Sequence, residues 1–173
     1  MAIIIDGNQG VSYPDGTLMP SAPVSPTSPY RVLTNRMPAG AVLQVVSAAT
    51  NTNTSTTSSS FVAITNLTAS ITPTSSTSKI LVLVNMNIYG ASVNTEAVAT
   101  IYRAGADLTG GSGFADVYAG STDIIQQAPM VYLDSPATTS STTYAVYFKR
   151  TQGTATIQSS LRDTTNTITL MEI

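Results

Sequence analysis

The sequence has no cysteine, no histidine and no tryptophan, and these absences remove most of the common enzyme chemistries. Without Cys and His, the chain cannot form Ser–His or Cys–His nucleophile pairs, and it cannot assemble the usual zinc ligand sets. It also cannot form a disulfide, so nothing in the sequence reports the redox compartment. We therefore predict a protein that is not an enzyme, with no catalytic residues, no cofactor and no metal site.

Charge is scarce as well. Only 9% of residues are charged, whereas 42% are hydrophobic and the mean hydropathy is +0.17. The net charge of −2 comes without a basic cluster, which argues against a nucleic-acid partner. Because each copy carries so few charges, copies of the chain repel one another only weakly. The composition therefore favours an oligomer that buries part of this surface.

Long hydrophobic runs are also missing. A membrane-spanning helix needs about 20 apolar residues, but the longest apolar run here, Ile80-Leu-Val-Leu-Val84, is followed by Asn85. The first residues, Met-Ala-Ile-Ile-Ile-Asp6, have no basic region and too short an apolar core for a signal peptide. We expect synthesis in the cytosol and no membrane insertion.

A few weaker catalytic patterns remain to be weighed. Ser–Lys catalysis would have to use Lys79 or Lys149, and we predict that both are solvated charges at strand ends. Asp116 and Asp123 flank a glycine-rich loop and are the pair of carboxylates that we consider for glycoside hydrolysis. Residues 109–113 lack the Gly-Lys-Ser/Thr ending of a phosphate loop and are predicted to be a flexible turn. Other acidic residues lie in turn-like contexts, where an Asp closes its own turn: Asp6, Asp15, Asp107 and Asp134.

The chain contains two regions that differ in kind. Residues 1–38 hold most of the prolines, and the turn signals Asp6-Gly7 and Asp15-Gly16 interrupt them. Residues 20–29 carry so many prolines that they are predicted to be extended. Residues 39–173 show regular β-patterning instead. We predict an N-terminal anchoring arm, 1–38, followed by one β-domain, 39–173.

The β-domain is recognised by apolar residues that recur with a period of two. We count roughly eight or nine strands, at the spacing of an all-β sandwich or barrel. The last strand, 167–173, is expected to pair within a sheet. Two core faces are predicted from the alternation: Phe61, Ala63, Leu67, Ala69 and Ile71 form one, and Ile80, Val82, Val84, Met86 and Ile88 form the other.

Strand 79–89 is unusual because Leu81 and Leu83 make its second face apolar too. That face either lies under a loop or meets another subunit.

One segment of the arm and several pieces of the β-domain resemble a known group of proteins. Gly10-Val-Ser-Tyr-Pro-Asp-Gly-Thr17 resembles the G-I-x-F-P-D-G-T element near the start of many phage fibre and appendage proteins. Residues 61–62, 71–73, 76–82, 133–136 and 168–173 resemble a C-terminal β-domain of tail-fibre-like and virion-surface proteins of tailed phages, including marine and cyanobacterial ones. The resemblance implies an antiparallel jelly-roll β-sandwich, commonly trimeric, whose N-terminal segment docks to the particle.

Two functions follow as expectations. The first is an accessory virion-surface protein (a capsid decoration protein, a short spike or a small tail component), because only about 40 residues precede the β-domain, without heptads or repeats. It is expected to be a homotrimer in the virion, bound to capsid or tail proteins through the arm residues Ile3, Ile4, Ile5, Tyr13 and Tyr30. The second is a tail-fibre knob that recognises a host surface glycan through Phe114 and Tyr118 in an exposed loop. Tyr102, Tyr132 and Tyr144 are assigned to the core or to an interface.

Overall fold

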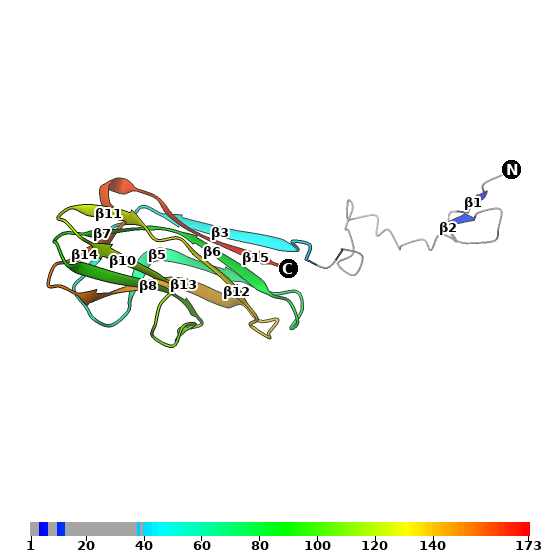
Figure 1. The fold of residues 1–173 in the computed structure, drawn as a ribbon. Coiled ribbons are helices and arrows are strands. Elements are labelled where there is room, and N and C mark those ends of the chain that lie inside the picture. Colours follow the sequence, from blue (N-terminus) through cyan, green and yellow to red (C-terminus); the bar gives the residue numbers. More distant parts are fainter. Residues whose placement is uncertain (1–3, 7–9, 13–37, 39) are drawn as a thin grey trace. The chain divides into compact units, whose positions relative to one another are not determined.

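The computed structural model describes residues 4–6, 10–12, 38 and 40–173, and the chain divides into two compact units, 1–38 and 39–173. In the first unit, β1 (Ile4–Asp6) pairs antiparallel with β2 (Gly10–Ser12) (Figure 1). The predicted anchoring residues Ile3, Tyr13 and Tyr30 lie outside the described residues, as does the proline-rich stretch 20–29. Ile4 and Ile5 lie in β1.

The second unit has an all-β fold of thirteen strands in three antiparallel sheets, which confirms the predicted class. The first sheet has the order β10 (Ala115–Ala119), β8 (Thr95–Arg103), β13 (Thr142–Gln152), β5 (Val62–Ile71), and β9 (Ala106–Asp107) also pairs with β8. The second has the order β12 (Met130–Asp134), β6 (Ile80–Asn85), β15 (Asn166–Glu172), β3 (Gln44–Thr50). The third has the order β11 (Ile124–Gln127), β7 (Asn87–Gly90), β14 (Ile157–Ser159), β4 (Thr54–Thr56). The helical turn η2 (Leu161–Asp163) precedes β15, and no helix among the described residues is long and apolar enough to cross a membrane.

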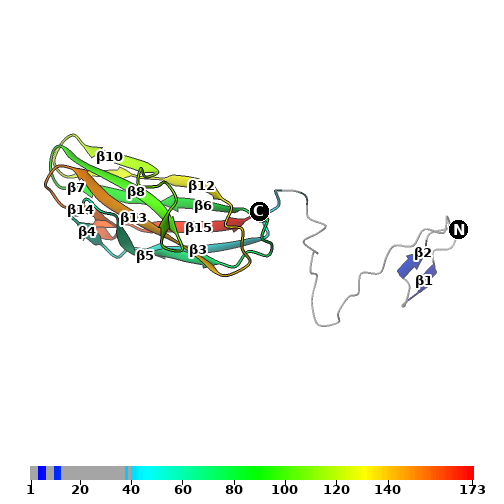
Figure 2. The ribbon, with the colours of Figure 1, turned by 90° about the horizontal axis from the view of Figure 1, so that it is seen from below.

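The second and third sheets are two halves of one layer. Their strands follow one another along the chain in pairs, β3 with β4, β6 with β7, β11 with β12 and β14 with β15, and the four pairs have the same order in both sheets. Figures 1 and 2 show the strands of each pair running on from one another. The number of strands exceeds the predicted eight or nine because each of these four long strands is interrupted once.

The core lies between this interrupted layer and the five-stranded sheet. Both layers contribute fully buried side chains, such as Tyr144 and Phe148 from β13 and Leu170 from β15. The predicted core face of strand 79–89 is confirmed, since Ile80, Val82, Val84, Met86 and Ile88 are all buried.

The predicted core face of β5 is correct only in part. Leu67, Ala69 and Ile71 are buried, but Ala63 is exposed and Ile64 is buried in its place. The alternation shifts because Asn66 adopts a left-handed backbone conformation with φ of 62°. Asn tolerates this conformation better than most residues do, and the irregularity reverses which side chains face inward. Phe61, at the start of this stretch, is half-buried and contacts Tyr102 on the outer side of the sheet.

A buried polar network lies where the second layer is interrupted. The main-chain N–H and the Nδ2 of Asn87 both donate to Asn166 Oδ1 at 3.1 Å. Asn87 Nδ2 also donates to Thr164 Oγ1 at 2.6 Å, and Asn166 Nδ2 donates to Ser160 Oγ at 2.8 Å. Because the strand ladder stops here, buried main-chain groups need other partners. The two Asn amides supply one acceptor and several donors.

We predict that Asn166→Ala lowers the free energy of unfolding by about 2–3 kcal/mol, because it leaves several buried polar groups without partners. Asn85→Ala serves as the matched control, since Asn85 is exposed at the end of β6. Its effect should stay within about 0.5 kcal/mol. Urea denaturation followed by circular dichroism measures both, and equal losses in the two variants would contradict the structural role of the network.

Candidate interaction surface

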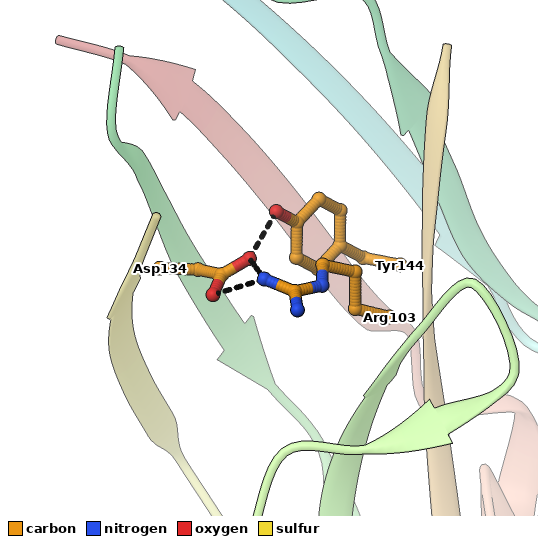
Figure 3. Close-up of polar contacts among 3 residues, drawn as sticks. All are labelled: Arg103, Asp134 and Tyr144. Atoms are coloured by element: carbon orange, nitrogen blue, oxygen red, sulfur yellow. Dashed lines mark hydrogen bonds and ion pairs between the residues drawn. The ribbon is translucent and has the colours of Figure 1, made fainter. Parts of the chain in front are cut away.

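A partly buried ion pair joins the two layers of the domain. Arg103 at the end of β8 and Tyr144 in β13 come from one layer, and Asp134 at the end of β12 comes from the other (Figure 3). Arg103 Nη1 donates to both carboxylate oxygens of Asp134, at 2.8 and 2.9 Å. The hydroxyl of Tyr144 donates to Asp134 Oδ2 at 2.6 Å. Asp134 was predicted to close its own turn, and this prediction is wrong.

This cluster has the chemistry of a structural clamp. Burial, followed by the hydrogen bond to Asp134 and its charge, raises the pKa of Tyr144 well above its ordinary value, so the phenol stays protonated and donates. The Asp134 carboxylate is 4% exposed and accepts from two neighbours.

A second buried carboxylate holds the C-terminal strand against a loop. Glu172 is fully buried and accepts from Gln44 Nε2 at 2.5 Å, from the Thr74 N–H at 2.7 Å and from Thr74 Oγ1 at 2.6 Å. Burial alone would raise the pKa of Glu172, but the hydrogen bonds outweigh it and keep the pKa below its ordinary value. The strand also pairs beyond Glu172, because Ile173 and Lys79 exchange main-chain hydrogen bonds of 2.9 and 3.0 Å. This confirms the prediction that the last strand is paired.

The carboxylates considered for catalysis have separate partners. Asp123 accepts a hydrogen bond from the Tyr89 hydroxyl. Asp116 lies beside Glu96 across β8 and β10, and burial together with this neighbouring acid raises the pKa of Asp116. Glu96 in turn accepts from Thr151 Oγ1 at 2.8 Å. Within the part of the chain that the structure describes, no group of three or more acidic side chains could hold a metal ion.

The glycine-rich loop, residues 109–113, begins as a turn on the surface, as predicted, and side chains around it bind its main chain. Asp107 accepts from Thr109 Oγ1 at 2.9 Å and from the Gly111 N–H at 2.6 Å. Lys149 Nζ donates to the Gly111 carbonyl oxygen at 2.9 Å. Burial raises the pKa of Asp107, but the hydrogen bonds it accepts outweigh burial and lower the pKa overall. As predicted for Asp107, this side chain closes its own turn.

The two predicted glycan-binding residues occupy different environments. Phe114 is half-buried and packs against the core, with its ring 5.0 Å from that of Tyr132, so less of its ring is available to a ligand than the prediction required. Tyr118 is 47% exposed, and its hydroxyl donates to Asn94 Oδ1 at 2.6 Å. It lies in strand β10 rather than in a loop. Because one ring packs inward and the other stays outside, the pair does not make a joint binding site.

Three other aromatic rings gather on the outer side of the five-stranded sheet. The rings of Tyr102 and Tyr147 stack at 3.9 Å, and Phe61 meets Tyr102 edge-on at 6.0 Å. Lys149 Nζ lies 4.3 Å from the centre of the Phe61 ring. Tyr144, by contrast, is fully buried, as predicted. The half-buried rings cover one another and stabilise this side of the sheet.

The opposite layer exposes a continuous apolar surface. On its outer side, the second sheet aligns Leu133, Leu81, Met171 and Val45 across all four strands. The next row begins with Val131 and Leu83 and continues with Thr169 and Ser47. We call the apolar members of the two rows the apolar face: Val45, Leu81, Leu83, Val131, Leu133 and Met171. The face contains no charged side chain.

Exposure within the apolar face is greatest on the two edge strands. Val131 is 65% exposed and Leu133 45% on β12, and Val45 is 54% exposed on β3. Leu81, Leu83 and Met171 on the central strands are half-buried. The other half of the layer is more polar, because its corresponding row reads Ile125, Tyr89, Gln158 and Ser55. A surface with this composition suits contact with another apolar surface.

Sequence reasoning missed Asp134 and Glu172, although a signal for both was present. Asp134 continues the alternation of Met130, and Glu172 that of Ile168 and Leu170, and all of these positions are buried. An acidic residue at a core-facing position must find partners. Nothing in the sequence indicated which partners these are.

Comparison with known proteins does not assign the surface to a family. No protein-family model matches the chain, and no curated protein matches it. Its function must therefore be argued from its own residues and geometry.

We predict that Tyr144→Phe lowers the free energy of unfolding by about 1–2 kcal/mol, because the hydrogen bond to buried Asp134 is lost. Asp134→Ala should cost more, about 2–3 kcal/mol, since it leaves the buried Tyr144 hydroxyl and the partly exposed Arg103 without their acceptor. Tyr118→Phe is the matched control, because it removes the same atom at an exposed site and should cost under about 0.5 kcal/mol. Urea denaturation measures all three, and similar losses for Tyr144→Phe and Tyr118→Phe would contradict the clamp.

Proposed function

We propose that this chain is a non-enzymatic structural component of a bacteriophage particle. In this proposal it is an accessory virion-surface protein (a capsid decoration protein, a short spike or a small tail component) that assembles in the cytoplasm of the bacterial host. Residues 1–38 anchor it to capsid or tail proteins, and residues 39–173 form a homotrimer. The observation that carries the proposal is the exposed, uncharged apolar face on a domain whose buried carboxylates, Asp134 and Glu172, are bound by its own residues.

Within the all-β class, the strand order supports a jelly-roll β-sandwich. With β9 set aside, joining the four interrupted pairs reduces twelve strands to eight. The first of these eight strands then pairs with the eighth, the second with the seventh, the third with the sixth and the fourth with the fifth. This is the nesting of a jelly roll, a fold found in viral capsid and lectin domains. Because a fold hosts many functions, it supports the proposal without carrying it.

The use of the buried polar side chains also supports a structural role. Asp134, Glu172 and Asp107 each accept hydrogen bonds from neighbouring residues of the domain. These bonds link the two layers, hold the C-terminal strand and order a loop. This stabilising role explains why the carboxylates are present, and the explanation does not require a substrate. Residues 10–17 resemble an element of phage appendage proteins, and this resemblance is the reason that we propose a phage particle as the place of assembly.

A tail-fibre knob that binds a host surface glycan is the second candidate. The exposed ring of Tyr118 on β10 favours it, because aromatic rings stack on sugars and the hydroxyl adds a polar contact. The inward packing of Phe114 removes its other main support. If Tyr118→Ala leaves adsorption to host cells unchanged, neither predicted residue supports the hypothesis of a glycan-binding knob.

We predict that a chain lacking residues 1–38 stays folded but no longer enters particles. The domain has a core of its own, whereas the arm would supply main-chain and apolar contacts to other virion proteins. The measurement is the copy number of the chain in purified particles, by quantitative immunoblot, for full-length and shortened protein. Circular dichroism of the shortened protein is the control for folding. Normal incorporation without the arm would overturn the anchoring role.

A further inference from the structure

We infer that copies of this chain associate through the apolar face. The inference rests on the proposed function, because it identifies the surface by which the proposed homotrimer forms. The face is the outer side of the sheet β12–β6–β15–β3, and its opposite side forms part of the core.

The apolar face is smaller than a whole protein interface and would form only its apolar part. Four strands about 4.8 Å apart and two rows about 7 Å apart cover about 250 Å², and the six apolar residues occupy about three quarters of it, roughly 200 Å². A standard interface covers about 800 Å² on each partner, with an apolar core and a polar rim. In a ring of copies the apolar face is shared between two such contacts, so it supplies a part of the apolar core of each. The surrounding residues, such as exposed Lys79 and Asn85, supply the rim.

The polar side chains among the apolar residues do not need water. Ser47 Oγ and Thr169 Oγ1 lie 3.0 Å apart and hydrogen-bond each other. Ser47 Oγ also lies 3.3 Å from the Ile168 carbonyl oxygen, to which it can donate. An apolar partner can cover these hydroxyls without leaving a buried donor or acceptor unsatisfied. A partner recognised by charge or by many hydrogen bonds would find few groups to bind here.

A second copy of the chain fits this face better than a charged partner does. The face has no charge, and the whole chain carries a net charge of −2 with 9% charged residues, so copies approach with little repulsion. Each copy also presents the uncharged apolar surface that the other requires.

The distribution of exposure suits a ring of copies. A subunit in a ring contacts one neighbour on each side. The two most exposed side chains, Val131 on β12 and Val45 on β3, lie on opposite edge strands of the sheet. One edge can therefore meet the preceding copy and the other the following copy.

The test is the mass of the full-length protein in solution, by size-exclusion chromatography with light scattering. We expect the unchanged protein at three times the 18.0 kDa chain mass. Val131→Glu and Val45→Glu, tested separately, should each lower the mass threefold, because each puts a charge into the contact. Ala63→Glu is the matched control, since Ala63 is exposed on the outer side of the edge strand β5 in the other layer, and it should keep the unchanged mass.

Circular dichroism and thermal unfolding test whether each variant is folded. We expect each variant to fold, because the substituted positions are exposed. The inference is overturned if the unchanged protein is a monomer, or if folded Val131→Glu and Val45→Glu keep its mass. A dimer that both variants dissociate supports the apolar face and contradicts the trimer. Loss of assembly in these variants, together with absence of the unchanged chain from purified particles, would support the surface and contradict the virion role.

Discussion

Burial of apolar side chains between two antiparallel layers holds this domain together, because the chain has few other means. It cannot form a disulfide, and Arg103–Asp134 is the ion pair found among the described residues. The pair joins the layers at the ends of β8 and β12, where Tyr144 adds a third contact. Each layer needs only one apolar side for this core. The apolar face on the outer side of the second layer is therefore additional to what folding requires, and it is the feature that points to assembly.

The interruption of the second layer separates two kinds of outer surface. On one side of it lies the apolar face, and on the other lies the more polar row that contains Tyr89 and Gln158. Asn166 Oδ1 accepts from the main-chain N–H of Asn87 where the strand ladders stop, and the side-chain amide of Asn87 donates to Asn166 Oδ1, so this N–H keeps a partner although the layer is interrupted. One layer can thus offer an assembly surface and a solvated surface along the same four strands.

The period of two in the sequence predicted the fold class and most of the core, because alternation alone decides which side of a strand is apolar. It predicted buried Ile80 and Val82, and the outward Leu81 and Leu83, correctly. It failed at Asn66, where a left-handed residue reverses the alternation and the residue type alone is only a weak signal of that conformation. It could not count the strands, because interruptions depend on hydrogen bonds between residues far apart, such as Asn87 and Asn166. The sequence predicted only the part of the apolar face formed by Leu81 and Leu83. The other members could not be predicted, because their alignment across four strands depends on how the strands pair in the sheet.

The rate at which a cysteine on the apolar face reacts tests the central claim most directly. The chain has no cysteine, so Val131→Cys in the full-length protein carries one thiol, and Ala63→Cys provides the control on the other layer. Both thiols are treated with a maleimide at a protein concentration that maintains the assembly. The account predicts that the thiol at position 131 reacts several-fold more slowly than that at position 63, and that the difference disappears on dilution. Equal rates in the concentrated protein would contradict it.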